Sequence, residues 1–295
     1  TALDWSAKSD FSSEGFDQSY WIYNGSNYAA YVNGTGVNNA NGFIPAGQAF
    51  FVHSSHAQTG AGMNTRSFGL GQSMRAANNR GRHKMNEEKA IRLGLRIDTN
   101  YFSEIALRYQ LGAEDGYNAG EDALLAGGLD EQSFYFQMDA DMALIIRHDA
   151  PLEGFKLYPL KLGSKALAQG HIQMKDAPED FFYYFLDAKN NLIDIQPERE
   201  LEAQSLGDGL QLVVSKHRLS QVHFKEVFWY LDAGDIYLNS FKEWKSIRVL
   251  NVQGQVIYET EEYSPQALLA LKEHAGVLLL QIEYPNEEKL LKLMR

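Results

Sequence analysis

Cysteine is absent from all 295 residues of the chain. This absence excludes disulfide bonds, thiolate zinc sites and cysteine nucleophiles, and it leaves the redox compartment open. Long apolar runs are also missing, since runs such as 142–146 and 277–280 fall far short of the roughly 20 residues that a membrane-spanning helix needs. The sequence therefore predicts no disulfide-stapled domain and no membrane-spanning segment.

Positive charge is in deficit. The chain has 27 Lys and Arg against 38 Asp and Glu, which gives a formal net charge of −11. This balance argues against a protein that binds nucleic acid by neutralising phosphates. One basic stretch departs from the balance, but it contains few aromatic residues that could stack on bases, and we interpret it as part of a solvated linker. Its members are Arg66, Arg75, Arg80, Arg82 and Lys84.

Helical periodicity is scarce as well. The only segments that read as short helices are 114–126 and 265–273, and the second has Ser264 as an N-cap followed by Pro265 at the first helical position. The absence of long stripes with a 3.6-residue period argues against a helix bundle or a doubly wound fold.

Aromatic residues, by contrast, make up 12% of the chain and lie in short segments separated by Gly and Asn. Such residues suit a half-buried pleated sheet. Residues 21–28 predict a tight Asn-Gly hairpin, residues 33–42 a loop, residues 43–52 a strand, and the strict alternation of 91–97 a half-buried strand. Further strands are expected at 104–111, 134–138, 143–147, 155–160, 168–174, 181–186 and 210–215, with the aromatic block 181–185 buried on both sides.

This spacing of strands predicts an all-β protein of two domains. Residues 1–220 are expected to form an antiparallel, jelly-roll-like β-sandwich module. Residues 57–86, where Gly, Asn, Gln and Arg replace the strand pattern, are expected to be a mobile excursion or linker within it. Alternating segments resume after 235 and are numerous enough to bury a core of their own, so residues 221–295 are predicted to form a small immunoglobulin-like β-sandwich.

Three elements occur in order in the C-terminal segment. Residues 247–258 form a hairpin pattern of two strands around an xxxG turn, with Gly254 at the glycine. Residues 276–282 form a strand pattern that starts at Gly276, and a final strand carries Lys289 and Lys292. These elements resemble the sorting domain of the type IX secretion system of Bacteroidota, whose second element is a Gly-[Val/Ile]-Tyr strand, although Leu278 stands where Tyr is usual. The resemblance covers about 227–295 and implies export through the periplasm to the outer surface or medium, with the type IX machinery as partner. The alternative interpretation is that these are the last strands of an ordinary sandwich.

The N-terminal part resembles a β-rich module that often precedes this sorting domain in large surface proteins. Residues 1–5 resemble the end of a GNPYPSxIDW motif, 44–52 its GQxFFV strand, and 114–123 its ATxGYDxxxDA stretch, in which the resemblance implies a structural turn at Asp122. The similarity covers about 1–215 and implies location and architecture rather than catalysis. We therefore interpret the chain as part of a longer protein, with any secretion signal outside it.

Each candidate catalytic or metal-binding residue also has a structural interpretation. His53 and His56 follow a strand without a third ligand at useful spacing, so we expect loop histidines rather than a metal site. Calcium binding through Glu114, Asp115, Glu121 and Asp122, or through Asp139 and Asp141, fits no EF-hand pattern, and solvated loops are the preferred interpretation. Ser73 lies in an incomplete nucleophile elbow, and no carboxylate pair forms a glycosidase motif. We predict neither an enzyme nor a cofactor, and an unrecognised hydrolase site is the weakest hypothesis.

The aromatic cluster of Trp21, Tyr23, Tyr28 and Tyr31 has two interpretations. Exposed aromatic faces beside Asn and Gly stack on sugar rings, which suits an adhesin or a carbohydrate-binding module. In a sandwich the same rings serve as core, which is the preferred interpretation. The sequence therefore predicts a non-enzymatic scaffold or adhesion module joined to a sorting domain. Its alternative is a carbohydrate-binding module that uses the surface 21–31, with a glycan or another surface ligand as partner.

Overall fold

The computed structural model describes residues 2–7, 15–54, 70, 74–75, 89–99, 101–138, 142–195, 197, 199–221, 227–232, 235–240, 242–264, 266–271, 274 and 276–294. Strands dominate these residues. The helices among them are the 3-10 turn η1 (Trp5–Ala7), α1 (Ser164–Gln169) and α2 (Ala203–Leu206). The predicted all-β, sandwich-type fold is therefore confirmed. In the described part of the chain no helix is long and apolar enough to span a membrane.

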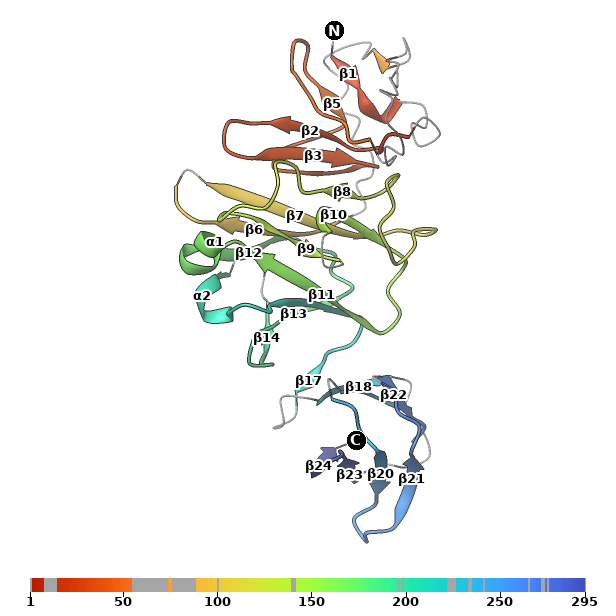
Figure 1. The fold of residues 1–295 in the computed structure, drawn as a ribbon. Coiled ribbons are helices and arrows are strands. Elements are labelled where there is room, and N and C mark those ends of the chain that lie inside the picture. The colour runs from red at the N-terminus through yellow and green to blue at the C-terminus, as the bar shows by residue number, and fades with distance from the viewer. Residues whose placement is uncertain are drawn as a thin grey trace, which may run out of the picture.

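The largest sheet, which curls through the middle of the molecule in Figure 1, has the strand order β14-β13-β16-β11-β9-β10-β7-β6-β12-β15, and β8 pairs with β10. Its strands are β6 (Ile91–Arg96), β7 (Phe102–Tyr109), β8 (Ala123–Leu124), β9 (Phe134–Gln137), β10 (Ala143–Asp149), β11 (Phe155–Leu162), β12 (His171–Asp176), β13 (Phe182–Leu186), β14 (Leu192–Asp194), β15 (Glu200–Glu202) and β16 (Gln211–Ser215). Its pairs are antiparallel except for β7 and β10, which run parallel. The purely antiparallel module predicted from the sequence is wrong in this one pair, because the chain between the two strands returns to the end at which β7 began.

A smaller sheet covers this one at the N-terminal end of the molecule (Figure 1). It has the order β2-β3-β4, and β1 pairs separately with β5. Trp21 of β2 and Phe51 exchange backbone hydrogen bonds of 3.0 and 2.8 Å, which ties the segment after β5 to the edge of this sheet. The bounds are β1 (Leu3–Asp4), β2 (Tyr20–Tyr23), β3 (Tyr28–Val32), β4 (Thr35–Val37) and β5 (Phe43–Ile44).

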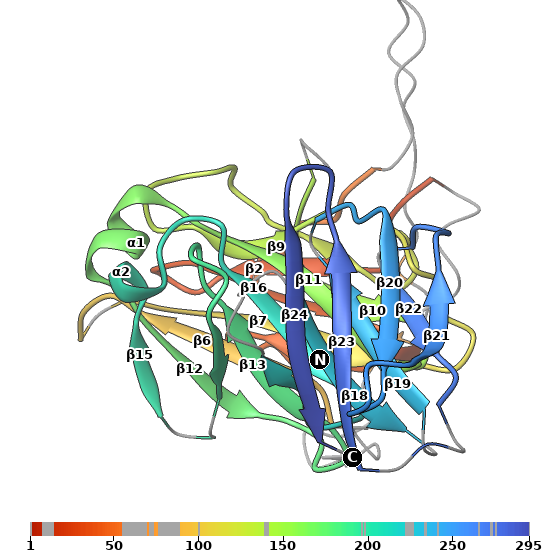
Figure 2. The same ribbon diagram turned by 90° about the horizontal axis from the view of Figure 1, so that it is seen from below.

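The C-terminal strands form two further four-stranded sheets, with orders β17-β18-β19-β22 and β21-β20-β23-β24. Seen from below in Figure 2, the second sheet lies in front of the first. Residues 227–293 contribute a hydrophobic cluster of their own, which includes Trp244, Ile247 and Leu280. The bounds are β17 (Ser220–Gln221), β18 (Val227–Asp232), β19 (Asp235–Ser240), β20 (Ser246–Leu250), β21 (Val256–Thr260), β22 (Gln266–Leu269), β23 (Val277–Glu283) and β24 (Glu288–Met294).

An aromatic joint connects these C-terminal sheets with the large sheet. The Tyr230 ring of β18 lies parallel to the His217 and Tyr237 rings, with centroids 4.7 and 4.8 Å away, and meets Phe155 edge-on at 6.1 Å. Gly154 has a positive φ of 77°, and a Cβ there would lie 2.7 Å from the Tyr230 hydroxyl. The absence of a side chain at Gly154 therefore lets Tyr230 enter the joint.

The predicted strand at 91–97 is confirmed as β6, with Ile91, Leu93 and Leu95 buried and Arg96 exposed. The predicted strand at 181–186 is confirmed as β13, which begins one residue later, at Phe182. Tyr183, Tyr184 and Phe185 are buried on its two faces. Phe182, however, is exposed, so the prediction of a strand that is buried throughout is wrong at its first residue.

Both predicted helices are wrong. Residues 114–126 form turns followed by β8, and residues 266–269 form the strand β22. The second error has a clear reason, because the apolar side chains of Ala267, Leu269 and Leu271 are buried at every second position. Pro265 and residues 272–273 of that predicted helix lie outside the described residues.

The predicted strand at 168–174 is wrong in its first half, where α1 occupies 164–169 and ends at Gly170 before β12 begins. A Cβ at Gly170 would lie 2.2 Å from the Ala166 carbonyl oxygen, so glycine permits this tight helix end. The predicted loop at 33–42 contains the strand β4, and the predicted strand at 43–52 reduces to β5 and an isolated bridge at Phe51.

The predicted hairpin forms between β2 and β3, but its loop has four residues instead of a two-residue Asn-Gly turn. The side chain of Asn24 explains the longer loop, since its Oδ1 accepts the N–H groups of Ser26 and Asn27 at 3.1 and 3.0 Å. The predicted excursion 57–86 lies outside the described residues except for Leu70, Met74 and Arg75. Met74 is buried in a small cluster with Trp5 and Tyr20.

Candidate binding site

The four aromatic residues singled out in the sequence divide between core and surface. Trp21 and Tyr31 are 3% and 5% exposed, so both belong to the interior. Tyr23 is 53% exposed, and its ring lies 5.4 Å from that of Tyr28, which is half-buried. The hairpin therefore presents Tyr23 and one side of Tyr28 to the outside, and its other two rings stabilise the core.

A cavity of about 360 Å³ opens beside this hairpin. We call it the aromatic cavity, and its walls include Trp21, Tyr28, Phe51, His53, Leu124 and Gly127. The Trp21 indole N–H donates to the Leu124 carbonyl at 3.0 Å, which fixes the segment 124–127 opposite the hairpin. The Phe51 ring is 55% exposed and meets Tyr28 at an interplanar angle of 75°. Two ring faces thus form a corner that is open to solvent.

A buried carboxylate positions the histidine of this cavity. Asp17 is fully buried, and its Oδ2 accepts hydrogen bonds from the Tyr117 hydroxyl at 2.7 Å and from His53 Nδ1 at 2.9 Å. His53 itself is half exposed. Because the carboxylate holds the proton on Nδ1, the neutral ring keeps Nε2 as an acceptor for a ligand. Asp17 Oδ1 is buried without a hydrogen-bond partner in the described part of the chain.

A second cavity, of about 230 Å³, adjoins the first at Tyr28. We call it the polar cavity, since its walls include Tyr23, Ser26, Asn27, Asn38, Tyr101 and Asp130. The two cavities share the Tyr28 ring and the segment 125–127. Gly127 has a φ of 85°, and a Cβ there would lie 2.9 Å from Tyr28 Cε2. Glycine at this position therefore allows the ring to lie against the backbone between the cavities.

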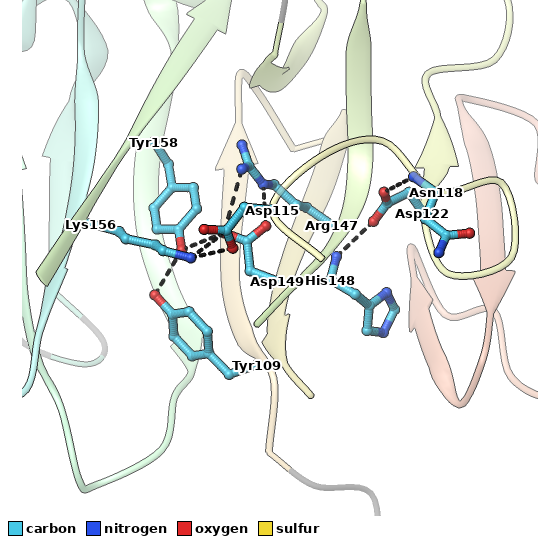
Figure 3. A network of polar contacts seen from close by, with 9 residues as sticks. All are labelled: Tyr109, Asp115, Asn118, Asp122, Arg147, His148, Asp149, Lys156 and Tyr158. Atoms are coloured by element: carbon cyan, nitrogen blue, oxygen red, sulfur yellow. Dashed lines mark hydrogen bonds and ion pairs between the residues drawn. The ribbon is translucent and has the colours of Figure 1, made fainter. Parts of the chain in front are cut away.

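Two carboxylates of the acidic stretch 114–122 make structural contacts. Asp122 is fully buried, and its two oxygens accept the N–H groups of Asn118 at 2.8 Å and His148 at 2.7 Å (Figure 3). Asp115 pairs with Lys156. Asp122 thereby closes the turn 118–122 and fastens it to β10, which agrees with the structural turn that the resemblance implies.

Another buried carboxylate, Asp149, lies at the centre of the network in Figure 3. It accepts from Arg147 Nε at 2.8 Å and from the Tyr158 hydroxyl at 2.9 Å, and Lys156 Nζ is 3.5 Å away. The Tyr158 hydroxyl also lies 2.9 Å from that of Tyr109. The network joins β7, β10 and β11, and two cations compensate its carboxylate, which is typical of a buried structural charge.

Burial shifts the pKa values of two neighbours in opposite directions. The pKa of Asp122 is raised to about 6 by loss of solvation, although the two backbone N–H groups oppose the shift. The pKa of His148 is lowered to about 4 by burial and by the positive charge of Arg108. Its Nε2 lies 3.1 Å from the Thr35 hydroxyl. At neutral pH this imidazole is therefore uncharged and serves as a hydrogen-bonding core residue.

Metal binding finds no support in the described ranges, where no group of three or more His, Cys, Asp or Glu residues is placed to hold an ion. Of the two candidate histidines, His53 is committed to Asp17. The other candidates His56, Ser73, Asp139 and Asp141 lie outside the described residues, as do Arg66, Arg80, Arg82 and Lys84. Arg75 forms an isolated backbone bridge with Leu3.

The residues that carry the sorting-domain resemblance lie at defined positions in the C-terminal sheets. Gly254 has a φ of 80° in the turn between β20 and β21, and Gly276 has a φ of 99° directly before β23. Lys289 Nζ is 3.4 Å from Glu287 and 5.9 Å from the centroid of the Tyr284 ring. Lys292 is exposed on the last strand, β24. Leu278, at the position where Tyr is usual, is buried.

Sequence reasoning missed Asp17 and Phe51 as members of the cavity region. The GQxFFV resemblance passes through Phe51 without showing that its ring faces outward. Asp17 is separated from His53 by 36 positions and from Tyr117 by 100, so no local spacing connects the three. The one available signal was His53 itself, a titratable residue directly after an apolar strand.

Fold and site together define a β-sandwich protein with a small open cavity of mixed aromatic and polar character. Comparison with family models found no match. Neither the curated proteins nor the solved structures include one that is significantly similar to the chain.

Proposed function

We propose that the chain is a non-enzymatic scaffold or adhesion module of a secreted or surface-attached protein, and that residues 221–295 direct its export as a type IX secretion sorting domain. The single observation that carries the proposal is the separate hydrophobic core of residues 227–293. A sorting domain must fold at the end of varied cargo, and a small sandwich built from local hairpins meets that requirement.

The positions of the resemblance residues support the same proposal. Gly254 and Gly276 occupy backbone conformations with positive φ, which side chains disfavour, so glycine has a conformational reason at both positions. Leu278 faces the core, where the usual Tyr would also place an apolar ring. The substitution at this position thus preserves burial and the alternation of β23.

The test transfers the C-terminal domain to a reporter in a bacterium that has a type IX system. A periplasmic fluorescent protein fused to residues 220–295 is expected to reach the surface or the medium, whereas a fusion to residues 1–219 stays in the periplasm. Cell fractionation measures both. Equal retention of the two fusions, or unchanged export of the chain after deletion of residues 227–295, contradicts the proposal.

A matched pair of variants tests whether export requires the folded C-terminal domain or only its peptide sequence. Leu280→Asp places a carboxylate in the core, where Leu280 is fully buried, and Leu268→Asp places one at a position that is 47% exposed. Because a buried unpaired charge unfolds a small domain, the Leu280→Asp fusion is expected to be retained and the Leu268→Asp fusion exported. Export of both variants would show that a folded surface is not what the machinery recognises.

A further inference from the structure

Two cavities of different character meet at one aromatic ring. The aromatic cavity, about 360 Å³, and the polar cavity, about 230 Å³, both use Tyr28 and the segment 125–127 as walls. Small-molecule sites typically have about 300–1,000 Å³ and combine apolar walls with a few placed polar groups. The volumes of the two cavities taken together fall in this range. The aromatic cavity provides the apolar walls, and the polar cavity provides most of the polar groups.

The aromatic cavity offers flat apolar faces near solvent. Phe51 is more than half exposed, and its backbone is tied to β2, so the residue is anchored while its ring stays uncovered. Its centroid lies 5.8 Å from that of Tyr28. The axial C–H faces of a pyranose ring are apolar and stack on such rings, while the hydroxyls at its rim need hydrogen-bond partners.

His53 provides one such partner at the wall of the same cavity. The buried Asp17 fixes the orientation of the imidazole through Nδ1, so Nε2 can accept a hydrogen bond from a sugar hydroxyl. A purely apolar ligand would leave this polar group desolvated, which costs free energy. A ligand that has both an apolar face and hydroxyl groups therefore fits this cavity better than a hydrocarbon does.

The polar cavity continues the same chemistry beyond Tyr28. Hydroxyl, amide and carboxylate groups line it, namely those of Tyr23, Ser26, Asn27, Tyr101 and Asp130. Such groups form hydrogen bonds with the rim of a sugar ring. Because the two cavities share Tyr28 and the segment 125–127 as walls, a second sugar of a linear saccharide can extend from one into the other.

We propose that the aromatic and polar cavities form one binding site for a saccharide of at least two rings, with one ring stacked in the corner of Phe51 and Tyr28 and the next among the polar side chains. This site differs from the surface 21–31 expected from the sequence, since Trp21 and Tyr31 are core residues and Phe51 and His53 take part. The proposal stands independently of the proposed sorting function, which concerns residues 221–295.

The experiment titrates the full chain with cellobiose, maltose, lactose, chitobiose and mannobiose and follows binding by saturation-transfer NMR. At least one disaccharide is expected to bind at millimolar concentration or below. Phe51→Ala removes an exposed ring and is expected to weaken that binding at least about tenfold. His53→Ala is expected to weaken it as well. Absence of binding by every disaccharide at millimolar concentration overturns the proposal.

Two glycines of similar backbone conformation provide the matched control. Gly127→Ala and Gly112→Ala introduce the same methyl group at φ values of 85° and 88°, but only the first meets Tyr28, whereas Gly112 has no atom within 4 Å of its Cβ position and lines neither cavity. Both variants are expected to lose stability in thermal unfolding because of the positive φ, and only Gly127→Ala is expected to lose binding. Equal saccharide affinity in the wild type, Phe51→Ala and Gly127→Ala would refute this location of the site.

Discussion

Burial shifts the pKa values of Asp122 and His148 in opposite directions within one network. The folded protein holds the proton of Asp122 up to about pH 6, and it keeps His148 neutral down to about pH 4. In the unfolded chain the two groups titrate near their ordinary pKa values of 3.8 and 6.5. Between pH 4 and 6 the folded pair is therefore uncharged while the unfolded pair carries one negative and one positive charge.

The two contributions to stability have opposite signs. Asp122 has a raised pKa, so its contribution is present below its unfolded pKa and is lost as pH rises through 6. His148 has a lowered pKa, so its contribution is present above its unfolded pKa and is lost as pH falls through 4. The free energy of unfolding of His148→Gln, taken relative to that of the wild type, is expected to fall by about 3 kcal/mol as pH rises from 4 to 6.5. For Asp122→Asn the same relative free energy is expected to rise by about as much from pH 4 to 6.

Chemical denaturation at several pH values measures both slopes. Asp194→Asn, which removes an exposed carboxyl, is the matched control for the loss of one acid. A pH profile of either variant parallel to that of the wild type would contradict the opposed burial effects.

At the level of residues, the sequence allowed some roles to be predicted and not others. Core packing was the preferred interpretation of the aromatic cluster, and it holds for Trp21 and Tyr31. The exposure of Tyr23 could not be predicted, because Tyr23 lies on the same strand face as Trp21. Which of the two rings is buried depends on where the neighbouring segments of the fold end, and the local sequence does not show that. The partnership of Asp17 with His53 and Tyr117 depends on long-range folding that no local pattern encodes.

Among the elements, the β20–β21 hairpin shows how a turn depends on particular side chains. Asn251 Oδ1 accepts the N–H groups of Gln253 and Gln255 at 3.0 Å each. Gly254 follows with a φ of 80° and open space around its Cβ position. The turn therefore relies on one side-chain acceptor and on one residue that tolerates positive φ.

Gly254→Ala is expected to destabilise the C-terminal sheets by about 1–2 kcal/mol, because a side chain disfavours the left-handed conformation even where space is available. Asn251→Ala is expected to cost about 1 kcal/mol through the loss of its hydrogen bonds. Amide hydrogen exchange of β20 and β21 in the full chain, measured at increasing denaturant concentration, follows both effects. Val252→Ala changes an exposed residue of the same turn and should leave stability unchanged; a loss equal to that of Gly254→Ala would contradict the argument.

The elements themselves were predictable where alternation is strict, as in β6 and in the strands after residue 235. They were not predictable where a short apolar segment satisfies two periods at once. Residues 266–269 have a helix-start signal at Ser264 but pair with β19, because sheet formation buries their alternate side chains. Similarly, the predicted strand at 168–174 begins only at His171, because α1 occupies 164–169 and ends at Gly170.

On the scale of the whole molecule, Tyr230 connects two hydrophobic cores. It belongs to a cluster that contains Phe155, Tyr184 and Leu219 from the large-sheet side of the joint. The Tyr184 hydroxyl also accepts the N–H of Leu219 at 3.0 Å. We therefore expect unfolding of the C-terminal sheets to be coupled to the large sheet through a few aromatic contacts.

Tyr230→Ala is expected to reduce this coupling. Differential scanning calorimetry of the variant should show the C-terminal transition separate from, and several degrees below, its position in the wild type, because truncation of a buried aromatic residue costs about 3–5 kcal/mol. Leu290→Ala, an exposed change in the same sheets, should leave the thermogram unchanged. A single unshifted transition in Tyr230→Ala would show that the joint does not connect the two cores energetically.

The sequence allowed the all-β class and the strand-rich C-terminal segment to be predicted, since both depend on local alternation. The strand order of the large sheet and the parallel pair of β7 and β10 could not be predicted in this way. Strand pairing between distant segments depends on which apolar faces remain exposed after the local hairpins have formed. A single sequence does not show which of the possible pairings buries these faces best.

The parallel pair also affects the order in which parts of the fold form during synthesis on the ribosome. Parallel neighbours need a long connection, and here residues 110–142 supply it, carrying the wall 124–127 that faces the β2–β3 hairpin. Trp21 and its anchor point at Leu124 are 103 positions apart, so the hairpin emerges long before its opposite wall is synthesised. Loops of this span close slowly. Both cavities therefore arise late, and nascent chains acquire them only after the connection has been completed.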